Sequence, residues 1–72
     1  MTSRIELLDV VALTVGLPDR GLLRGQVGTI VEILCPDVFE VEFSDDAGRT
    51  YAQAALNAQQ LMLLHYQPEQ AA

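Results

Sequence analysis

The stretch VFEVEFSDDAGRTYAQAAL, residues 38–56, decides the fold class of this chain. Its first part alternates apolar and acidic side chains, which is typical of a strand with one buried and one solvated face. Asp45, Asp46 and Gly48 follow, and these residue types tolerate the positive φ angles that a tight hairpin requires. The stretch therefore predicts a β-hairpin whose returning strand begins at Thr50.

A helix competes with the second half of this interpretation. YAQAALNAQQLMLLH, residues 51–65, is rich in good helix formers, and propensity alone would make it one helix. Because a hairpin needs a returning strand, we expect instead a strand over 50–56, a single helical turn at 57–60 and a short last strand from Leu61. The tail, residues 66–72, has little apolar content and is expected to be disordered.

Two further strands are expected before the hairpin. VVALTV, residues 10–15, has apolar residues at both odd-numbered and even-numbered positions, as in a strand that is covered on two sides. Residues 16–25 hold several glycines and a proline and are therefore expected to form a long loop. The chain then resumes as a strand over about 26–34. Gly25 is expected to take a positive φ at the entry of this strand, and Gly28 lets the strand bend or approach another backbone closely.

The order of these elements is that of an SH3-like barrel, and RGQVGTIVEI, which starts at Arg24, looks like the KOW-type turn that opens a barrel strand. As a whole, residues 7–64 resemble a bacterial family of small stand-alone proteins of unknown function. The resemblance implies an SH3-like fold and no established activity. We therefore expect one all-β domain over residues 1–72, a five-stranded barrel with one short helical turn before the last strand, in which Gly25, Gly28 and Gly48 serve turns and bends.

The charge balance bears on the choice of partner. Ten carboxylates face four arginines and no lysine, which gives a net charge of −6 at pH 7. A phosphate backbone is repelled on average by such a chain, so nucleic-acid binding is not expected unless the arginines converge on one face. Around the KOW-like turn only Arg20 and Arg24 are basic, and Glu32 lies within the strand. The balance favours a protein partner with a basic surface.

Few residues could support catalysis, a metal or a cofactor. The lone Cys35 allows no internal disulfide and indicates a reducing compartment, and we expect its side chain to be buried or half-buried. His65 has no second histidine or cysteine nearby to complete a zinc site. Asp45 and Asp46 lack the alternate spacing of a calcium loop. We expect no catalytic, metal or cofactor site, and no deep pocket, because so short a chain buries only roughly 60% of its surface.

The sequence also bears on localisation. Glu6 and Asp9 interrupt the apolar run near the N-terminus that a signal peptide would need. No run approaches the ~18 apolar residues of a membrane span. We expect a cytoplasmic protein without a membrane partner.

The candidate binding residues are apolar or basic side chains of the long loop, together with one tyrosine: Leu17, Pro18, Arg20, Leu22, Leu23 and Tyr51. Glu40 and Glu42, with Glu32 on the neighbouring strand, would form an acidic stripe, which is either a solvated face or a docking place for a basic partner. The many leucines, including the run at 61–64, are either covered by the chain's own segments or leave apolar surface for a partner or a second copy.

These observations favour a non-enzymatic intracellular protein-interaction module, which could be an accessory subunit of a larger complex. One alternative is an antitoxin-type or immunity-type inhibitor that blocks a basic partner protein. A KOW-like RNA-binding domain is the less favoured alternative, because the surroundings of the turn lack positive charge.

Overall fold

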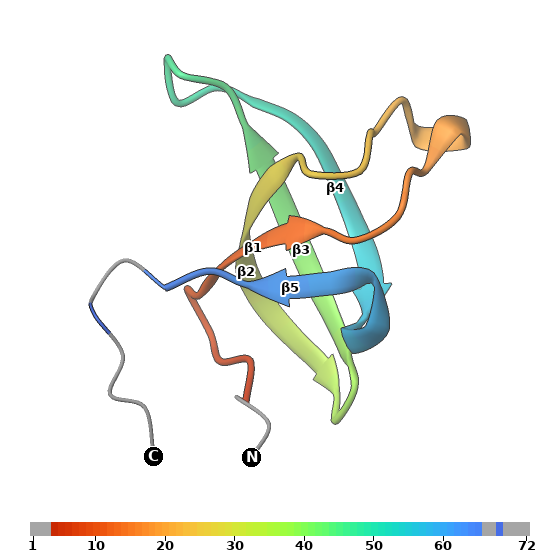
Figure 1. Ribbon diagram of the computed structural model, residues 1–72. Coiled ribbons are helices and arrows are strands. Elements are labelled where there is room, and N and C mark those ends of the chain that lie inside the picture. The colour runs from red at the N-terminus through yellow and green to blue at the C-terminus, as the bar shows by residue number, and fades with distance from the viewer. Residues whose placement is uncertain (1–3, 66–67, 69–72) are drawn as a thin grey trace.

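The computed structural model describes residues 4–65 and Pro68 (Figure 1). Five strands form one antiparallel sheet with the order β4-β3-β2-β1-β5. The strands are β1 (Val10–Leu13), β2 (Val27–Cys35), β3 (Val38–Ser44), β4 (Thr50–Asn57) and β5 (Leu61–Leu63), and two 3-10 turns accompany them, η1 (Pro18–Arg20) and η2 (Ala58–Gln60). The expected all-β fold with five strands and a helical turn before the last strand is confirmed. The expectation of a disordered tail falls on residues that, apart from Pro68, lie outside the described part of the chain.

Residues 51–65 form β4, η2 and β5 and not the competing helix. The helical turn is stabilised by a reciprocal capping box: the Asn57 side chain accepts hydrogen bonds from the N–H groups of Gln59 and Gln60, and the Gln60 side chain accepts one from the Asn57 N–H. Such a box satisfies backbone donors that a helix start leaves open. The sequence NAQQ therefore ends β4 and starts the turn to β5.

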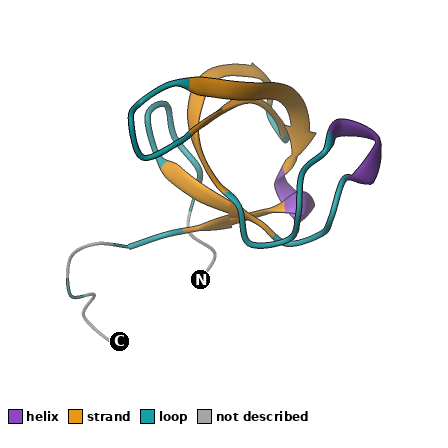
Figure 2. Ribbon diagram, turned by 90° about the horizontal axis from the view of Figure 1, so that it is seen from above, coloured by secondary structure: helices purple, strands orange, loops and turns teal. Residues whose placement is uncertain are grey.

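The sheet curls around its own apolar face, so that its strands surround the core when viewed from above (Figure 2). The alternation in VFEVEF is confirmed here, since Phe39, Val41 and Phe43 are buried while Glu40 and Glu42 are not. The core combines these side chains with others from every strand and from the loop between β1 and β2: Val11, Leu13, Leu22, Ile30, Ala54, Leu56 and Leu61.

The first strand ends at Leu13 and is therefore shorter than expected, and the next residue, Thr14, is hydrogen-bonded to η2. Its N–H donates to the carbonyl oxygen of Gln60 over 2.9 Å, and its hydroxyl donates to the carbonyl oxygen of Gln59 over 2.9 Å. Thr14 thereby fixes the start of the long loop against η2, and Val15 after it is exposed.

A bulge changes which side of β2 faces the core. Ile30 pairs with Val41, but the next pair is Glu32 with Glu40, so Val31 is an extra residue without a partner in β3. Before this bulge the even-numbered residues Gly28 and Ile30 point inward, and directly after it the even-numbered Glu32 points outward, up to a second register shift between Ile33 and Cys35. The bulge therefore places Glu32 on the outer face of the sheet, directly opposite Glu40.

Gly28 lies where β1, β2 and β3 come too close for a side chain. It is buried, and its Cα partners are Val11 in β1 and Phe43 in β3. A Cβ atom added to it would lie 2.6 Å from Cγ1 of Val41 and 3.0 Å from Cδ2 of Phe43. The sheet can curl tightly at this point because Gly28 leaves the space to these two side chains.

The hairpin between β3 and β4 is a turn stabilised by Asp45. The Oδ1 atom of Asp45 accepts hydrogen bonds from the N–H groups of Ala47 and Arg49, each over 2.9 Å. Gly48 has a φ of 81°, which glycine adopts without the strain that a Cβ atom would cause. Gly25, with a φ of 93°, plays the same part at the entry to β2.

Candidate functional site

Gln26 joins the end of the long loop to β4. Its Oε1 atom accepts a hydrogen bond from the N–H of Leu23, and its Nε2 atom donates one to the hydroxyl of Tyr51 over 3.2 Å. Tyr51 is the extra residue at a register shift between β3 and β4, and a bulge of this kind redirects a side chain. The Tyr51 ring packs against Phe43 with ring centroids 6.4 Å apart. The Gln26 side chain thus connects the end of the long loop to the first residues of β4.

The leucines of the long loop between β1 and β2 lie partly in the core and partly on the surface. Leu22 is 1% exposed and belongs to the core, and Leu17 is half-buried against it. These two residues bond to each other through both backbone groups across η1. The backbone pairing turns the Leu22 side chain into the core, so of the predicted partner-binding residues Leu22 offers almost no side-chain surface in this conformation.

The other predicted residues lie on the outside. Leu23 is 70% exposed and Tyr51 is 48% exposed. Pro18 and Arg20 are exposed in η1, within the same loop. The structure therefore brings the loop end and Tyr51 together through Gln26, a residue that sequence reasoning did not single out. Its signal was its position directly after the Gly25 turn, where a side chain can reach back to the loop.

Three carboxylates form an acidic outer face, which we define as Glu32, Glu40 and Glu42. Glu32 lies directly opposite Glu40 in the register of β2 and β3, and Glu42 lies opposite Thr29. Within the described part of the chain, none of the three forms an ion pair with an arginine, since the pair found there joins Arg49 to Asp45. Like charges directly opposite each other destabilise a sheet. Stability alone therefore does not explain the Glu32–Glu40 pair.

The arginines are distributed over separate parts of the fold. Arg20 and Arg24 are exposed in the long loop, Arg49 pairs with Asp45 at the tip of the β3–β4 hairpin, and Arg4 lies in the N-terminal segment. A protein that binds nucleic acid needs its cations along one face to neutralise successive phosphates.

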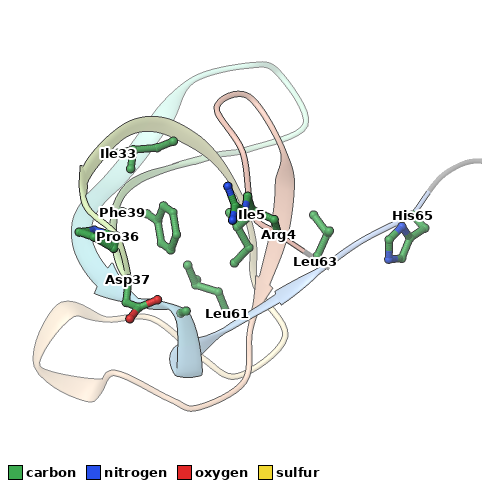
Figure 3. Close-up of a pocket in the computed structure, with 10 residues that line it drawn as sticks. Arg4, Ile5, Ile33, Pro36, Asp37, Phe39, Leu61, Leu63 and His65 are labelled. Carbon is green, nitrogen blue, oxygen red and sulfur yellow. The ribbon is translucent and has the colours of Figure 1, made fainter. Parts of the chain in front are cut away.

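A hollow of about 760 Å³ opens where β2 turns into β3 (Figure 3). Its apolar lining includes Ile5, Ile33, Phe39, Leu61 and Leu63. Its polar lining includes Arg4, Asp37 and His65. We expected no deep pocket in a chain of this length. The hollow is compatible with so small a core because it lies beside the core and is open to solvent. Sequence reasoning missed it because its walls come from segments far apart in the chain.

Cys35 is exposed at the end of β2, which corrects the expectation of a buried or half-buried side chain: the strand ends there and the chain turns away from the core. Across residues 4–65 and 68, no three His, Cys, Asp or Glu side chains gather where they could hold a metal ion. The same residues include no helix with the length and apolarity to cross a membrane.

The fold defines a class, that of small β-sheet proteins with a single five-stranded antiparallel sheet. Residues 7–63 match the family described as Domain of unknown function (DUF4926), and the chain belongs to this family. No curated protein matches the chain, and no solved structure matches it.

Proposed function

We propose that the protein is a non-enzymatic intracellular module for protein interaction, built on an SH3-like barrel, and that it serves as an accessory subunit of a larger complex. The observation that carries this proposal is the Gln26 bridge, in which one side chain is hydrogen-bonded both to the backbone of exposed Leu23 and to the hydroxyl of exposed Tyr51. Apolar and aromatic side chains on a fixed framework are typical of a protein-binding surface.

The element order supports the barrel. A long loop joins the first two strands, a tight hairpin joins β3 to β4, and η2 leads into a short last strand that pairs with the first. The curled sheet in Figure 2 agrees with this interpretation. In such a barrel the loop between the first two strands flanks a groove, and this is where Pro18, Arg20 and Leu23 lie.

The charge supports a partner with a basic surface. The chain has a net charge of −6, and its acidic outer face has no arginine paired to it in the described residues. Electrostatic complementarity speeds the encounter of such partners and excludes acidic ones.

Capture from the lysate of the native organism tests the proposal. The tagged protein is expected to retain a partner protein at near-equal stoichiometry, at low salt and after nuclease treatment. Replacing Leu23 and Tyr51 together by Ser should abolish this capture. Met62→Ser is the control, because Met62 is an apolar residue, 54% exposed, on β5, which pairs with β1 and not with β4. Equal capture by the double variant would contradict the proposal. Recovery of RNA, or loss of the bound proteins after nuclease, would favour the KOW-like RNA-binding alternative.

The acidic outer face supports a second candidate, an antitoxin-type or immunity-type inhibitor of a basic protein. A carboxylate pair such as Glu32 and Glu40 can occupy a cationic active site. This candidate predicts that deletion of the gene for this chain alone harms the cell, whereas loss of an accessory subunit impairs only the complex to which it belongs.

A further inference from the structure

We propose that the free edge of β4 binds an extended, basic segment of a partner protein, which adds to the sheet as a sixth strand. This inference rests on the proposed function and names the partner's chemistry. β4 is an end strand of the sheet and pairs only with β3. Its sequence TYAQAALN extends over eight residues and contains no charged residue and no proline. Proteins usually protect so long an edge with a lysine, a proline or a covering segment.

The capping box shows which backbone groups face outward. The N–H of Asn57 donates to the side chain of Gln60 over 3.0 Å, so it points away from β3. Because successive residues of a strand alternate in direction, the N–H and C=O groups of Ala55 and Gln53 point away from β3 as well. No backbone hydrogen bond among the described residues engages these groups. They are the donors and acceptors that an added strand needs.

The register of the sheet places carboxylates within reach of such a strand. Glu32, Glu40 and Ala55 lie side by side in one row across β2, β3 and β4. A residue of the added strand opposite Ala55 would lie two strand spacings, about 10 Å, from the backbone of Glu40. Ala55 leaves this path open, so a Lys or Arg side chain can extend over its methyl group and meet the Glu40 carboxylate.

The neighbouring row consists of Thr29, Glu42 and Gln53 across β2, β3 and β4. Glu42 pairs with Gln53, which is exposed and can hydrogen-bond to a polar side chain of the added strand. We therefore expect a cationic side chain opposite Ala55, where the path to Glu40 is open, and a polar side chain opposite Gln53. The expected segment alternates, with a basic residue opposite Ala55.

Charge also decides between a partner and a second copy of this chain. A second copy would pair its own β4 or β5 with this edge, and neither strand carries a cation. It would also bring a second net charge of −6 next to the first. The unpaired carboxylates of Glu32 and Glu40 favour the basic segment.

An eight-residue peptide of alternating Val and Lys is the probe for this edge, and the same peptide with Glu in place of Lys is its control. Titration into the isotopically labelled protein should shift the backbone resonances of residues 50–57 and protect the amides of Gln53 and Ala55 from hydrogen exchange. The Glu peptide should not bind. Affinity for the Lys peptide should fall severalfold with added salt, because partly exposed ion pairs are screened.

Three variants test the details. Ala55→Lys adds a like charge in the open row and should weaken peptide binding about tenfold, an ordinary penalty for losing one such ion pair and adding repulsion. Ala47→Lys makes the same change in net charge at the hairpin tip, away from the edge, and should leave the affinity nearly unchanged. Ala55→Pro removes the outward N–H but no ladder bond to β3, and should abolish binding while circular dichroism shows a retained fold.

Equal binding of the Lys peptide to the Ala55→Lys variant, or shifts that map outside β4, would overturn the inference. So would self-association of the protein alone with protection of residues 50–57, because a second copy would then occupy the edge. If partner capture depends on Leu23 while the peptide does not bind, the proposed function stands and the β4 inference fails. If the peptide binds and no partner is captured, the edge site stands and the proposed function fails.

Discussion

The side-chain amide of Gln26 lies 3.2 Å from the hydroxyl of Tyr51, and this hydrogen bond joins residues 25 positions apart in the chain. Because the same side chain also accepts a hydrogen bond from the N–H of Leu23, the loop end depends on it at two points. The position of the loop end at Leu23 therefore depends on Gln26, which directly precedes β2 and need not contact a partner itself.

Replacement of Gln26 should release the loop end. In Gln26→Ala the N–H of Leu23 loses its acceptor, so its hydrogen exchange should become faster. Tyr51→Phe removes only the second bond and should leave the Leu23 amide protected, at a cost of about 0.5–1.5 kcal/mol or less in the free energy of unfolding. Equal exchange of the Leu23 amide in both variants would show that Gln26 does not hold the loop.

Truncation of the two adjacent leucines in the loop should change the stability of the fold by very different amounts. Leu22 is 1% exposed, so Leu22→Ala should lower the free energy of unfolding by about 2–5 kcal/mol. Leu23 is 70% exposed, and Leu23→Ala should change it by no more than about 0.5 kcal/mol. Denaturant unfolding of the two variants checks this difference, and similar values for both would refute the loop conformation.

An added methyl group at Gly28 should be poorly tolerated. The new Cβ would clash with Val41 and Phe43, and overpacking of this kind costs about 1–3 kcal/mol. Gly16→Ala is the matched control, because its Cβ would meet no atom closer than 3.9 Å and should be neutral or slightly stabilising. Thermal unfolding of the pair tests the close packing of β1, β2 and β3, which equal melting temperatures would contradict.

Removal of one carboxylate from the acidic outer face should stabilise the fold. Glu40→Gln ends the repulsion between Glu40 and Glu32, and should raise the free energy of unfolding by about 0.2–1 kcal/mol at low salt. The gain should shrink at high salt, because exposed charges are screened. Glu42→Gln, opposite Thr29 and Gln53, should give a smaller gain. A destabilised Glu40→Gln variant would indicate that Glu40 has a structural partner.

The sequence predicted those features of the fold that are local. The turn residues Asp45 and Gly48 lie between the two strands of the hairpin, within a few residues of both. The alternation of VFEVEF can be recognised within six residues. The helical turn at NAQQ depends on Asn57 and Gln60, which are three residues apart. Turn chemistry and side-chain periodicity act over these short distances, so they outweighed the helix propensity of residues 51–65.

The features that the sequence did not predict depend on contacts between distant segments. Nothing in the neighbourhood of Val31 marks it as a bulge, because the bulge follows from the pairing of β2 with β3. Leu22 and Leu23 are the same residue type, and only the backbone pairing of Leu17 with Leu22 decides which of them is buried. The hollow beside Phe39 likewise arises only once four segments have come together.

The exposure of Cys35 has a practical consequence. It is the only cysteine in the chain, and it directly precedes Pro36 and Asp37, which line the hollow. A thiol-reactive fluorophore would therefore attach at one defined position without any engineered mutation. Its emission would respond to a molecule entering the hollow, while the β4 edge could be monitored independently through its backbone amides.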